Sequence, residues 1–432
     1  GYDTNTTEPD EALLEEAQEA AKNADVAVVF VGITDAMESE GMDRRTLSMP
    51  KNHEALVKAV SEVQKNTVVV VMCGGCITMS WIDDVRGVLY AYLGGEAVGT
   101  ATLDLLFGDV NPSGKLAETF PRRLEDNPSY LYFFGDEQNK TEYREGVFVG
   151  YRYYDKKNMD VLFPFGYGLS YTTFEYSNLT LDKSEMNDTD TLTVSVNVRN
   201  TGKVKGKEVV QLYVGNRTGK SGFAVRELKG FEKVKLAAGE SKCVAIPLDD
   251  KAFRYWNTMT NAWEIEGGRY EIRVGASCED IRLTATVEVA GTGAPNPQAG
   301  ISLPHYESGK VMNVPDAEWE VLLDRPIPDD TVKIDRNMTL GELKHSRSPL
   351  CWLVWLVLHT MLTNSYKQGK PNLNVMFQYN MPLRALAKMT SGAISMGMVD
   401  GIVLEAKGFW GIGLCKVLVE AVKNAILNAQ LE

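Results

Sequence analysis

Acidic and basic side chains gather in one short stretch, residues 35–50, which reads DAMESEGMDRRTLSMP. Two carboxylates, Glu38 and Glu40, stand two residues apart, and Gly41 follows the second one directly. A glycine beside a carboxylate lets the backbone turn sharply and presents the acid at a loop tip. A guanidinium such as that of Arg44 can orient a carboxyl group or hold it charged. The stretch is therefore a candidate for proton-transfer chemistry, with a solvated acidic connection as the alternative.

A second candidate for chemistry is the segment Cys73-Gly-Gly-Cys76, which has the spacing of redox and metal-binding motifs. The other four cysteines and the four histidines are scattered along the chain, so four zinc ligands cannot be assembled. We expect free thiols in a turn after a buried strand, no cofactor and no metal, and keep a redox protein as the less favoured alternative. The glycines of 93–99 have the wrong spacing for a dinucleotide loop and favour close packing of a helix on a strand.

Apolar patterns on both sides of the acidic stretch predict the elements that position it. Val26–Val31 and Thr67–Met72 are continuous apolar runs, typical of strands buried on both faces of a parallel sheet. A third strand is expected at Val88–Leu93, and helices are expected at Pro9–Asn23 (capped by Thr7), His53–Val63 and Glu96–Phe107 (closed by Gly108). This alternation predicts an α/β fold with the acidic stretch at the carboxyl end of the first strand, a common place for chemistry.

The pattern changes after residue 174. Short runs with period-two alternation, such as Thr191–Val198 and Val209–Val214, predict a β-sandwich without a catalytic set, in which Gly230-Phe231 and Trp256 are expected as core or turn markers. Ala290–Ala299 has the composition of a linker. Helical patterns follow, the last near Gly413–Leu427, and we expect them to pack on another domain.

Several segments resemble one known family. Ser39-Glu-Gly-Met-Asp-Arg44, followed by Leu47-Ser-Met-Pro50 and a helix, is similar to the acid/base loop of glycoside hydrolase family 3, the β-glucosidase and β-xylosidase group. Three further collinear segments resemble the same family: NPSGKL at 111–116, EGVFVGYRYYD at 145–155 and LFPFGYGLSYTTF at 162–174. The segments at 198–202 and 209–214 resemble its fibronectin type III-like domain, and the tail is similar to C-terminal extensions of some bacterial members.

The resemblance implies an α/β plus all-β architecture in three parts. We expect an N-terminally truncated α/β sandwich with a mostly parallel sheet at 1–174, a fibronectin type III-like β-sandwich at 175–292, and a linker with a mostly helical C-terminal extension at 293–432. Aromatic residues are dense in the last two α/β segments, and packing between domains is preferred for most of them over stacking on sugar rings. They are Tyr151, Tyr153, Tyr154, Phe163, Phe165 and Tyr167.

The resemblance also implies a function. The glutamate before the glycine, here Glu40, is the general acid/base of a retaining β-glycosidase acting on terminal β-linked glucosyl or xylosyl residues; the substrate-binding residues stay unassigned. Glu38 is expected to raise the pKa of Glu40, and Arg44 to orient the loop through Asp43. The family's nucleophile is an aspartate on a (β/α)8 barrel, and no matching motif occurs here, so this chain alone is expected to be inactive.

The expected partners follow from this assignment and from the charge. They are a β-glucoside or oligosaccharide and the missing N-terminal (β/α)8 barrel, while association into a homo-oligomer is left open. The net charge of −13 argues against nucleic acid, and the apolar run at 350–358 is too short to cross a membrane. A cytoplasmic location is slightly favoured. The alternative function is a non-catalytic carbohydrate-binding or adhesion module.

Overall fold

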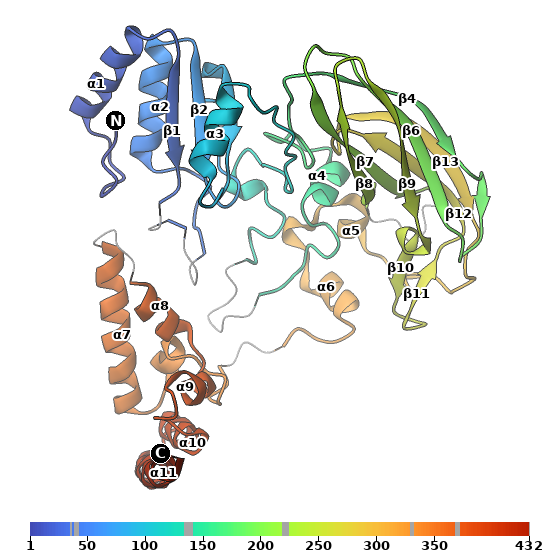
Figure 1. Ribbon diagram of the computed structural model, residues 1–432. Helices are drawn as coiled ribbons and strands as arrows, with labels where there is room; N and C mark the ends of the chain where they lie inside the picture. The colour runs from blue at the N-terminus through green and yellow to red at the C-terminus, as the bar shows by residue number, and fades with distance from the viewer. Residues whose placement is uncertain are drawn as a thin grey trace.

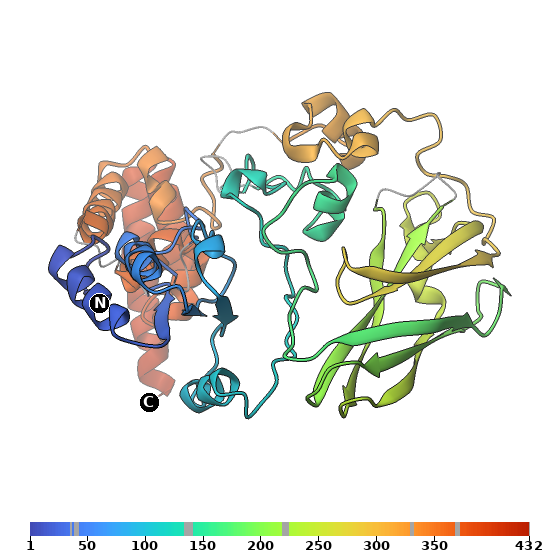
Figure 2. The ribbon, with the colours of Figure 1, turned by 90° about the horizontal axis from the view of Figure 1, so that it is seen from above.

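The computed structural model describes residues 1–34, 37–38, 43–133, 141–217, 224–328, 332–367 and 372–431. Figures 1 and 2 show an α/β unit beside a β-sandwich, with a group of C-terminal helices on the side of the α/β unit. None of the helices in these ranges has both the length and the apolar character that crossing a membrane requires.

The α/β unit is built on a three-stranded parallel sheet in the order β1-β2-β3. Its strands are β1 (Ala27–Gly32), β2 (Thr67–Met72) and β3 (Gly87–Tyr90). Its helices are α1 (Glu11–Lys22), α2 (Lys51–Val63), α3 (Val98–Leu106) and α4 (Tyr151–Lys157), with short 3-10 turns at Ile82–Asp84 and Leu124–Asp126. The expected parallel sheet and its helices are confirmed.

One face of β1 is packed and the other is not, whereas β2 is buried on both faces, with Val69 and Val70 fully buried. Val29 and Val31 lie in the core with Leu56 and Val60 of α2, because alternate residues of a strand point to opposite faces. On the other face, Val28 and Phe30 are 42% and 47% exposed. The expectation that β1 is buried on both sides is therefore wrong for this chain.

The ends of the helices are set by local chemistry. Asp10, and not Thr7, caps α1, because its side chain accepts a hydrogen bond from the amide of Leu13. Gly108, with φ of +80°, follows α3 in the left-handed conformation that a glycine adopts without strain, as expected.

The β-sandwich packs a five-stranded sheet, β5-β13-β12-β7-β8, against a three-stranded sheet, β4-β6-β9. Its strands are β4 (Phe174–Leu181), β5 (Glu185–Met186), β6 (Leu192–Asn200), β7 (Gly206–Asn216), β8 (Glu227–Leu236), β9 (Ser241–Leu248), β12 (Gly268–Gly275) and β13 (Ile281–Val289). A 3-10 turn at Asp250–Ala252 precedes the hairpin of β10 (Arg254–Asn257) and β11 (Ala262–Ile265). The expected sandwich is confirmed, but Phe231 and Trp256 are exposed and are not core residues.

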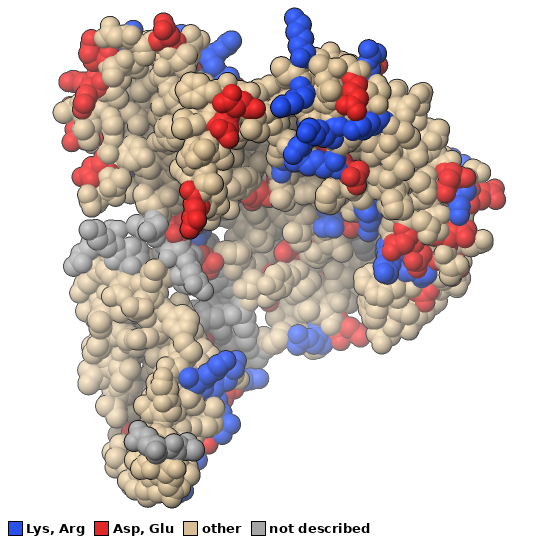
Figure 3. Space-filling view, viewed as in Figure 1, with Lys and Arg blue, Asp and Glu red and all other residues tan. Residues whose placement is uncertain are grey.

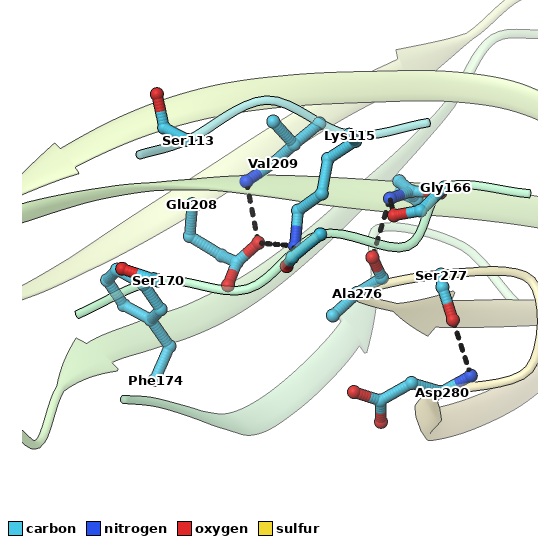
Figure 4. A network of polar contacts seen from close by, with 12 residues as sticks. Ser113, Lys115, Gly166, Ser170, Phe174, Glu208, Val209, Ala276, Ser277 and Asp280 are labelled. Atoms are coloured by element: carbon cyan, nitrogen blue, oxygen red, sulfur yellow. Dashed lines mark hydrogen bonds and ion pairs between the residues drawn. The ribbon is translucent and has the colours of Figure 1, made fainter. Parts of the chain in front are cut away.

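A buried ion pair joins the α/β unit to the sandwich. Lys115 Nζ, from the segment after α3, lies 3.1 Å from Glu208 Oε1 of β7, and both side chains are largely buried (Figure 4). Lys115 also donates to the carbonyl of Gly168, and Gln211 of β7 donates to the carbonyl of Gly166 at 3.0 Å. A buried charge needs such partners to offset its lost hydration, so these contacts fix how the two units meet.

Aromatic rings complete this junction. Tyr151 of α4 stacks on Phe165 with ring centroids 4.7 Å apart, meets Tyr213 of β7 edge-on, and accepts a hydrogen bond from the amide of Leu228. Packing between units is thus confirmed for this part of the aromatic set.

The first helices after the linker pack back onto the α/β unit. They are α5 (Pro304–Ser308), the 3-10 turn Val311–Asn313 and α6 (Asp316–Leu323). Tyr306 packs against Phe148 and Tyr153 and donates to the carbonyl of Arg144, whose Nη1 donates to the carbonyl of Val314. This part of the extension behaves as expected from the sequence.

The remaining helices pack on one another around their own core. They are the 3-10 turn Gly341–His345, α7 (Pro349–Lys367), α8 (Leu373–Asn380), α9 (Leu383–Met389), α10 (Met396–Ala406) and α11 (Trp410–Leu431). Their core includes Leu383, Val399 and Ala406. Glycines let α10 and α11 approach closely: a Cβ on Gly413 would lie 2.6 Å from the amide nitrogen of Glu405. Packing on another domain, expected for the whole tail, is therefore replaced here by packing within it.

We expect Gly413→Ala to destabilise the α10–α11 pair by about 1–3 kcal/mol, because its methyl group would collide with backbone that cannot move aside. Amide hydrogen exchange of both helices in the full chain measures this local stability.

The matched control is Gly411→Ala, two residues earlier on α11, where a Cβ would meet nothing within 4 Å. Amide hydrogen exchange of α10 and α11 in this variant should be as slow as in the unsubstituted chain or slower, since alanine favours a helix over glycine. Equal exchange in both variants would contradict the close approach.

Candidate functional site

The acidic stretch leaves the carboxyl end of β1, as expected, but its central acid cannot be placed. Glu40 lies outside the described residues, together with 35–36, 39 and 41–42. The structure describes Glu38 on one side of it in the chain, and Asp43 onward on the other side. The site is therefore built from these two flanks, and the role of Glu40 stays a prediction.

Glu38, which precedes Glu40 in the chain, contacts the turn after β2. β1 and β2 are parallel neighbours with Gly32 opposite Met72, so the loops that follow them begin side by side. Glu38 Oε2 accepts a hydrogen bond from the amide of Gly74 at 3.0 Å, and Cys73 Sγ lies 3.7 Å from the same oxygen. A Cβ on Gly74 would lie 2.3 Å from Glu38 Oε1. The glycine thus makes room for the carboxylate.

Arg44, which follows Glu40 in the chain, contacts the same turn. Arg44 Nη1 donates to the carbonyl of Cys76 at 3.1 Å and lies 3.9 Å from Cys73 Sγ. We call Glu38, Arg44 and the turn Cys73–Cys76 the loop clamp. It holds the chain two residues before and four residues after Glu40.

Only part of the Arg44 guanidinium forms hydrogen bonds within the clamp. Nε and Nη2 of Arg44 are buried and make no hydrogen bond in the part of the chain that is described. A buried donor without a partner costs free energy, so these two nitrogens are available to an acceptor that reaches them. The expected orientation through Asp43 is not what the structure gives: Asp43 is exposed, and Arg44 bonds to the turn.

Burial shapes the titration of the groups around the clamp. It raises the pKa of the Cys73 thiol and raises that of Cys76 to about 12. Burial also raises the pKa of the Glu118 carboxyl; the charge of Glu38 adds to this effect, and that of Arg44 opposes it. Tyr90 donates to the carbonyl of Gly75, and its pKa is raised mainly by burial. The clamp therefore lies in partly desolvated surroundings, where a charge has strong effects on its neighbours.

The outcome for the sequence-based candidates is mixed. Glu38 and Arg44 are brought to one turn. The expected effect of Glu38 on the pKa of Glu40 stays a prediction, because Glu40 lies outside the described residues. Cys73 and Cys76 are free thiols, as expected, and no group of metal-binding side chains occurs in the described ranges. Sequence reasoning missed that the Cys73–Cys76 turn holds the loop, and it missed Glu118. The available signal was the position of that turn after the neighbouring parallel strand.

Family models match two parts of the chain. Residues 4–171 match the glycosyl hydrolase family 3 C-terminal domain, and residues 208–278 match the fibronectin type III-like domain.

Curated relatives share this region. The thermostable beta-glucosidase B of Acetivibrio thermocellus is 53% identical over 292 residues, which are 68% of this chain and 38% of the relative. The exo-alpha-(1->6)-L-arabinopyranosidase of Bifidobacterium longum is 45% identical over 298 residues, 69% of this chain and 39% of that protein. The chain thus spans about two fifths of the length of these relatives.

Solved structures of beta-glucosidases also match this chain. The GH3 beta-glucosidase of Bifidobacterium adolescentis matches with a TM-score of 0.65 and 41% identity, over 73% of this chain and 45% of that one. The beta-glucosidase of Kluyveromyces marxianus in complex with glucose matches with a TM-score of 0.62 and 41% identity, over 66% of this chain and 34% of that one.

The thiols of the clamp, buried at Cys73 and half-buried at Cys76, should be unreactive. With a pKa of about 12, roughly one Cys76 thiol in ten thousand is ionised at pH 8, and the thiolate is the reactive form. We expect Cys76 to react with a disulfide reagent at least about 100-fold more slowly than the exposed Cys243, measured in variants that keep one cysteine each.

Unfolding in urea is the control, because it should bring the two rates together. Fast reaction of both Cys73 and Cys76 in the folded chain, or a disulfide between them, would favour the redox alternative instead.

Proposed function

Since the chain belongs to glycoside hydrolase family 3, we propose that it is the C-terminal part of a retaining β-glycosidase and supplies Glu40 as the general acid/base. The substrates are terminal β-linked glucosyl or xylosyl residues. The observation that carries the proposal is the loop clamp: Glu38, just before the sequence SEGMDR, and Arg44, at its end, both bind one turn at the carboxyl edge of the sheet.

The chemistry assigns distinct tasks to the two carboxyl groups of such an enzyme. One attacks the anomeric carbon, and the other protonates the leaving oxygen and then deprotonates water, with about 5 Å between them. Glu40 takes the second task, and the nucleophile belongs to a (β/α)8 barrel outside this sequence. The clamp serves this chemistry by limiting the positions of the acid, because misplacing a catalytic group by even 1 Å can lower the rate about 100-fold.

The surface of the α/β unit supports a missing upstream part. Val28 and Phe30 expose apolar side chains on one face of the sheet, and in the described structure β1 pairs only with β2. Apolar surface of this kind is normally covered by another layer. Together with a chain that spans about two fifths of its first relatives, this favours further sheet and barrel before residue 1.

A non-catalytic carbohydrate-binding or adhesion module is not favoured. The named relatives are glycosidases, and Tyr151, Tyr153 and Tyr154 are buried rather than presented to a sugar.

The decisive test is Glu40→Gln in the protein completed with its upstream barrel. We expect kcat on a cellobiose-like β-glucoside to fall by roughly 100-fold or more, because glutamine cannot donate a proton. The loss should be much smaller on aryl β-glucosides with good leaving groups, which need little protonation. A panel of aryl β-glucoside, β-xyloside and α-L-arabinopyranoside identifies the sugar.

The matched control is Asp43→Asn, an exposed carboxyl of the same stretch, which should retain activity. An equal loss in both variants, or none in Glu40→Gln, would refute the assignment, as would clear turnover by the 432-residue chain alone.

The clamp has a test of its own. Gly74→Ala would place a methyl group 2.3 Å from Glu38 Oε1 and push the carboxylate off the turn. A Cβ on Gly75 would lie 3.9 Å from its nearest neighbouring atom, Arg44 Nη1, which is an ordinary van der Waals distance. In the completed enzyme we expect Gly74→Ala to lower kcat about 10-fold or more with little change in KM, and Gly75→Ala to leave both nearly unchanged.

A positioning role also predicts that the loss in Gly74→Ala shrinks on substrates with good leaving groups, as for Glu40→Gln. A loss that is equal on all substrates would show that the clamp only maintains the fold.

A further inference from the structure

Exposed lysines gather on the outer face of two neighbouring strands of the β-sandwich. Lys207 of β7 lies directly opposite Lys235 of β8, and the next pair on the same side joins Val209 to Lys233. Lys205, one residue before β7, is a fourth exposed lysine. We call Lys205, Lys207, Lys233 and Lys235 the lysine patch. Figure 3 shows lysine and arginine side chains gathered on the β-sandwich beside the α/β unit.

The carboxylates next to the lysine patch are engaged elsewhere. Glu208 pairs with the buried Lys115 at 3.1 Å, and Glu240, which follows β8, pairs with Lys242 at 3.3 Å. Glu232 alternates with the lysines along β8 and so lies on the other side of that strand. In the ranges that the structure describes, none of the four lysines of the patch forms an ion pair.

The lysines of the patch repel one another. Like charges directly opposite each other on neighbouring strands destabilise a sheet. Partial burial lowers the pKa of Lys233, and the charges of Lys207 and Lys115 lower it further, so these ammonium groups lie within one another's field. Lys233 Nζ donates to the carbonyl of Ser113 at 3.0 Å, which carries no negative charge. The repulsion is therefore not offset by an ion pair in the described part of the chain.

A negatively charged partner would offset it. The chain as a whole has a net charge of −13 and a pI of about 5.0, so a cluster of unpaired lysines does not follow from its composition. At physiological ionic strength exposed charges act over about 8 Å. An anion that reaches this face is therefore attracted by the patch more than it is repelled by the distant acids.

The side chains around the patch indicate the kind of anion. The four cations are all lysines, whereas arginine is the residue that binds phosphate groups in a bidentate manner. Nucleic-acid-binding domains are commonly basic overall, with a pI above about 9. Lipid headgroups are recognised by basic residues beside a membrane helix or on an amphipathic one, and this patch lies on a sheet.

An exposed aromatic ring completes the surface. Phe231 precedes Lys233 by two residues on β8, which places it on the same side of the strand, and it is 64% exposed. The flat apolar face of an aromatic ring suits the C–H side of a sugar ring. Ammonium groups beside such a ring match a sugar that carries carboxylates.

We propose that the lysine patch and Phe231 bind an acidic polysaccharide, with its carboxylates on the lysines and a sugar ring on Phe231. The choice of a saccharide among anionic polymers rests on the proposed glycosidase function. The surface itself lies on the β-sandwich, apart from the loop clamp, so it holds the chain on a polymer without taking part in the reaction.

Binding of polygalacturonate to the 432-residue chain, measured by isothermal titration calorimetry, tests the proposal. We expect binding to weaken at least about 10-fold when NaCl is raised from about 20 to 300 mM, because salt screens exposed charges. Neutral dextran should not bind. The double variant Lys207→Gln/Lys235→Gln should weaken binding about 10-fold or more, and its melting temperature should be unchanged or higher, because a repulsive pair is removed.

The matched control is Lys22→Gln/Lys51→Gln, which removes the same charge from exposed lysines that already pair with Glu19 and Glu8, and it should bind polygalacturonate normally. Absent binding, equal weakening in both double variants, or dextran bound as tightly as polygalacturonate would overturn the proposal. Tighter binding of duplex DNA or of anionic vesicles would overturn it in favour of those partners.

Unfolding of Lys207→Gln/Lys235→Gln would show that the lysines maintain the sandwich and would also count against the proposal. The assay needs no turnover, so its failure would leave the assignment of Glu40 standing. Failure of the Glu40→Gln test would in turn leave the measured binding of polygalacturonate unchanged.

Discussion

The parallel pairing of β1 with β2 is the constraint on which the candidate site depends. Parallel strands end at the same edge of a sheet, so the loop after β1 and the turn after β2 begin next to each other. Glu38 and Arg44 can then reach one turn from opposite sides of Glu40. A sheet in which β1 and β2 were not neighbours would separate these residues, whatever the local sequence of the loop.

The clamp uses backbone groups of the turn as well as side chains. The amide of Gly74 and the carbonyl of Cys76 provide a donor for the carboxylate and an acceptor for the guanidinium. The carboxylate of Glu38 and the guanidinium of Arg44 thus each bind an uncharged backbone group of the turn instead of each other. Nε and Nη2 of Arg44 have no hydrogen-bond partner in the described part of the chain.

Local patterns predicted the fold better than they predicted contacts. β2 has the predicted limits, and the α/β and β-sandwich patterns were confirmed, because hydrophobic periodicity reports directly on burial. Burial of both faces of β1 was wrong, since it depends on a layer that the described chain does not contain. The cap of α1 shifted from Thr7 to Asp10 because several nearby residues can cap a helix. The partner of Arg44 was missed because a contact across 32 residues depends on strand order.

The three parts of the chain are joined by unequal means, and this has a functional consequence. The α/β unit meets the sandwich through the buried Lys115–Glu208 pair and the stacked rings of Tyr151 and Phe165. The helices α7–α11 instead have a core of their own. A unit with its own core can acquire or lose a partner without disturbing the loop clamp. The tail can therefore vary without changing the edge of the sheet where the loop clamp lies, as a modular chain allows.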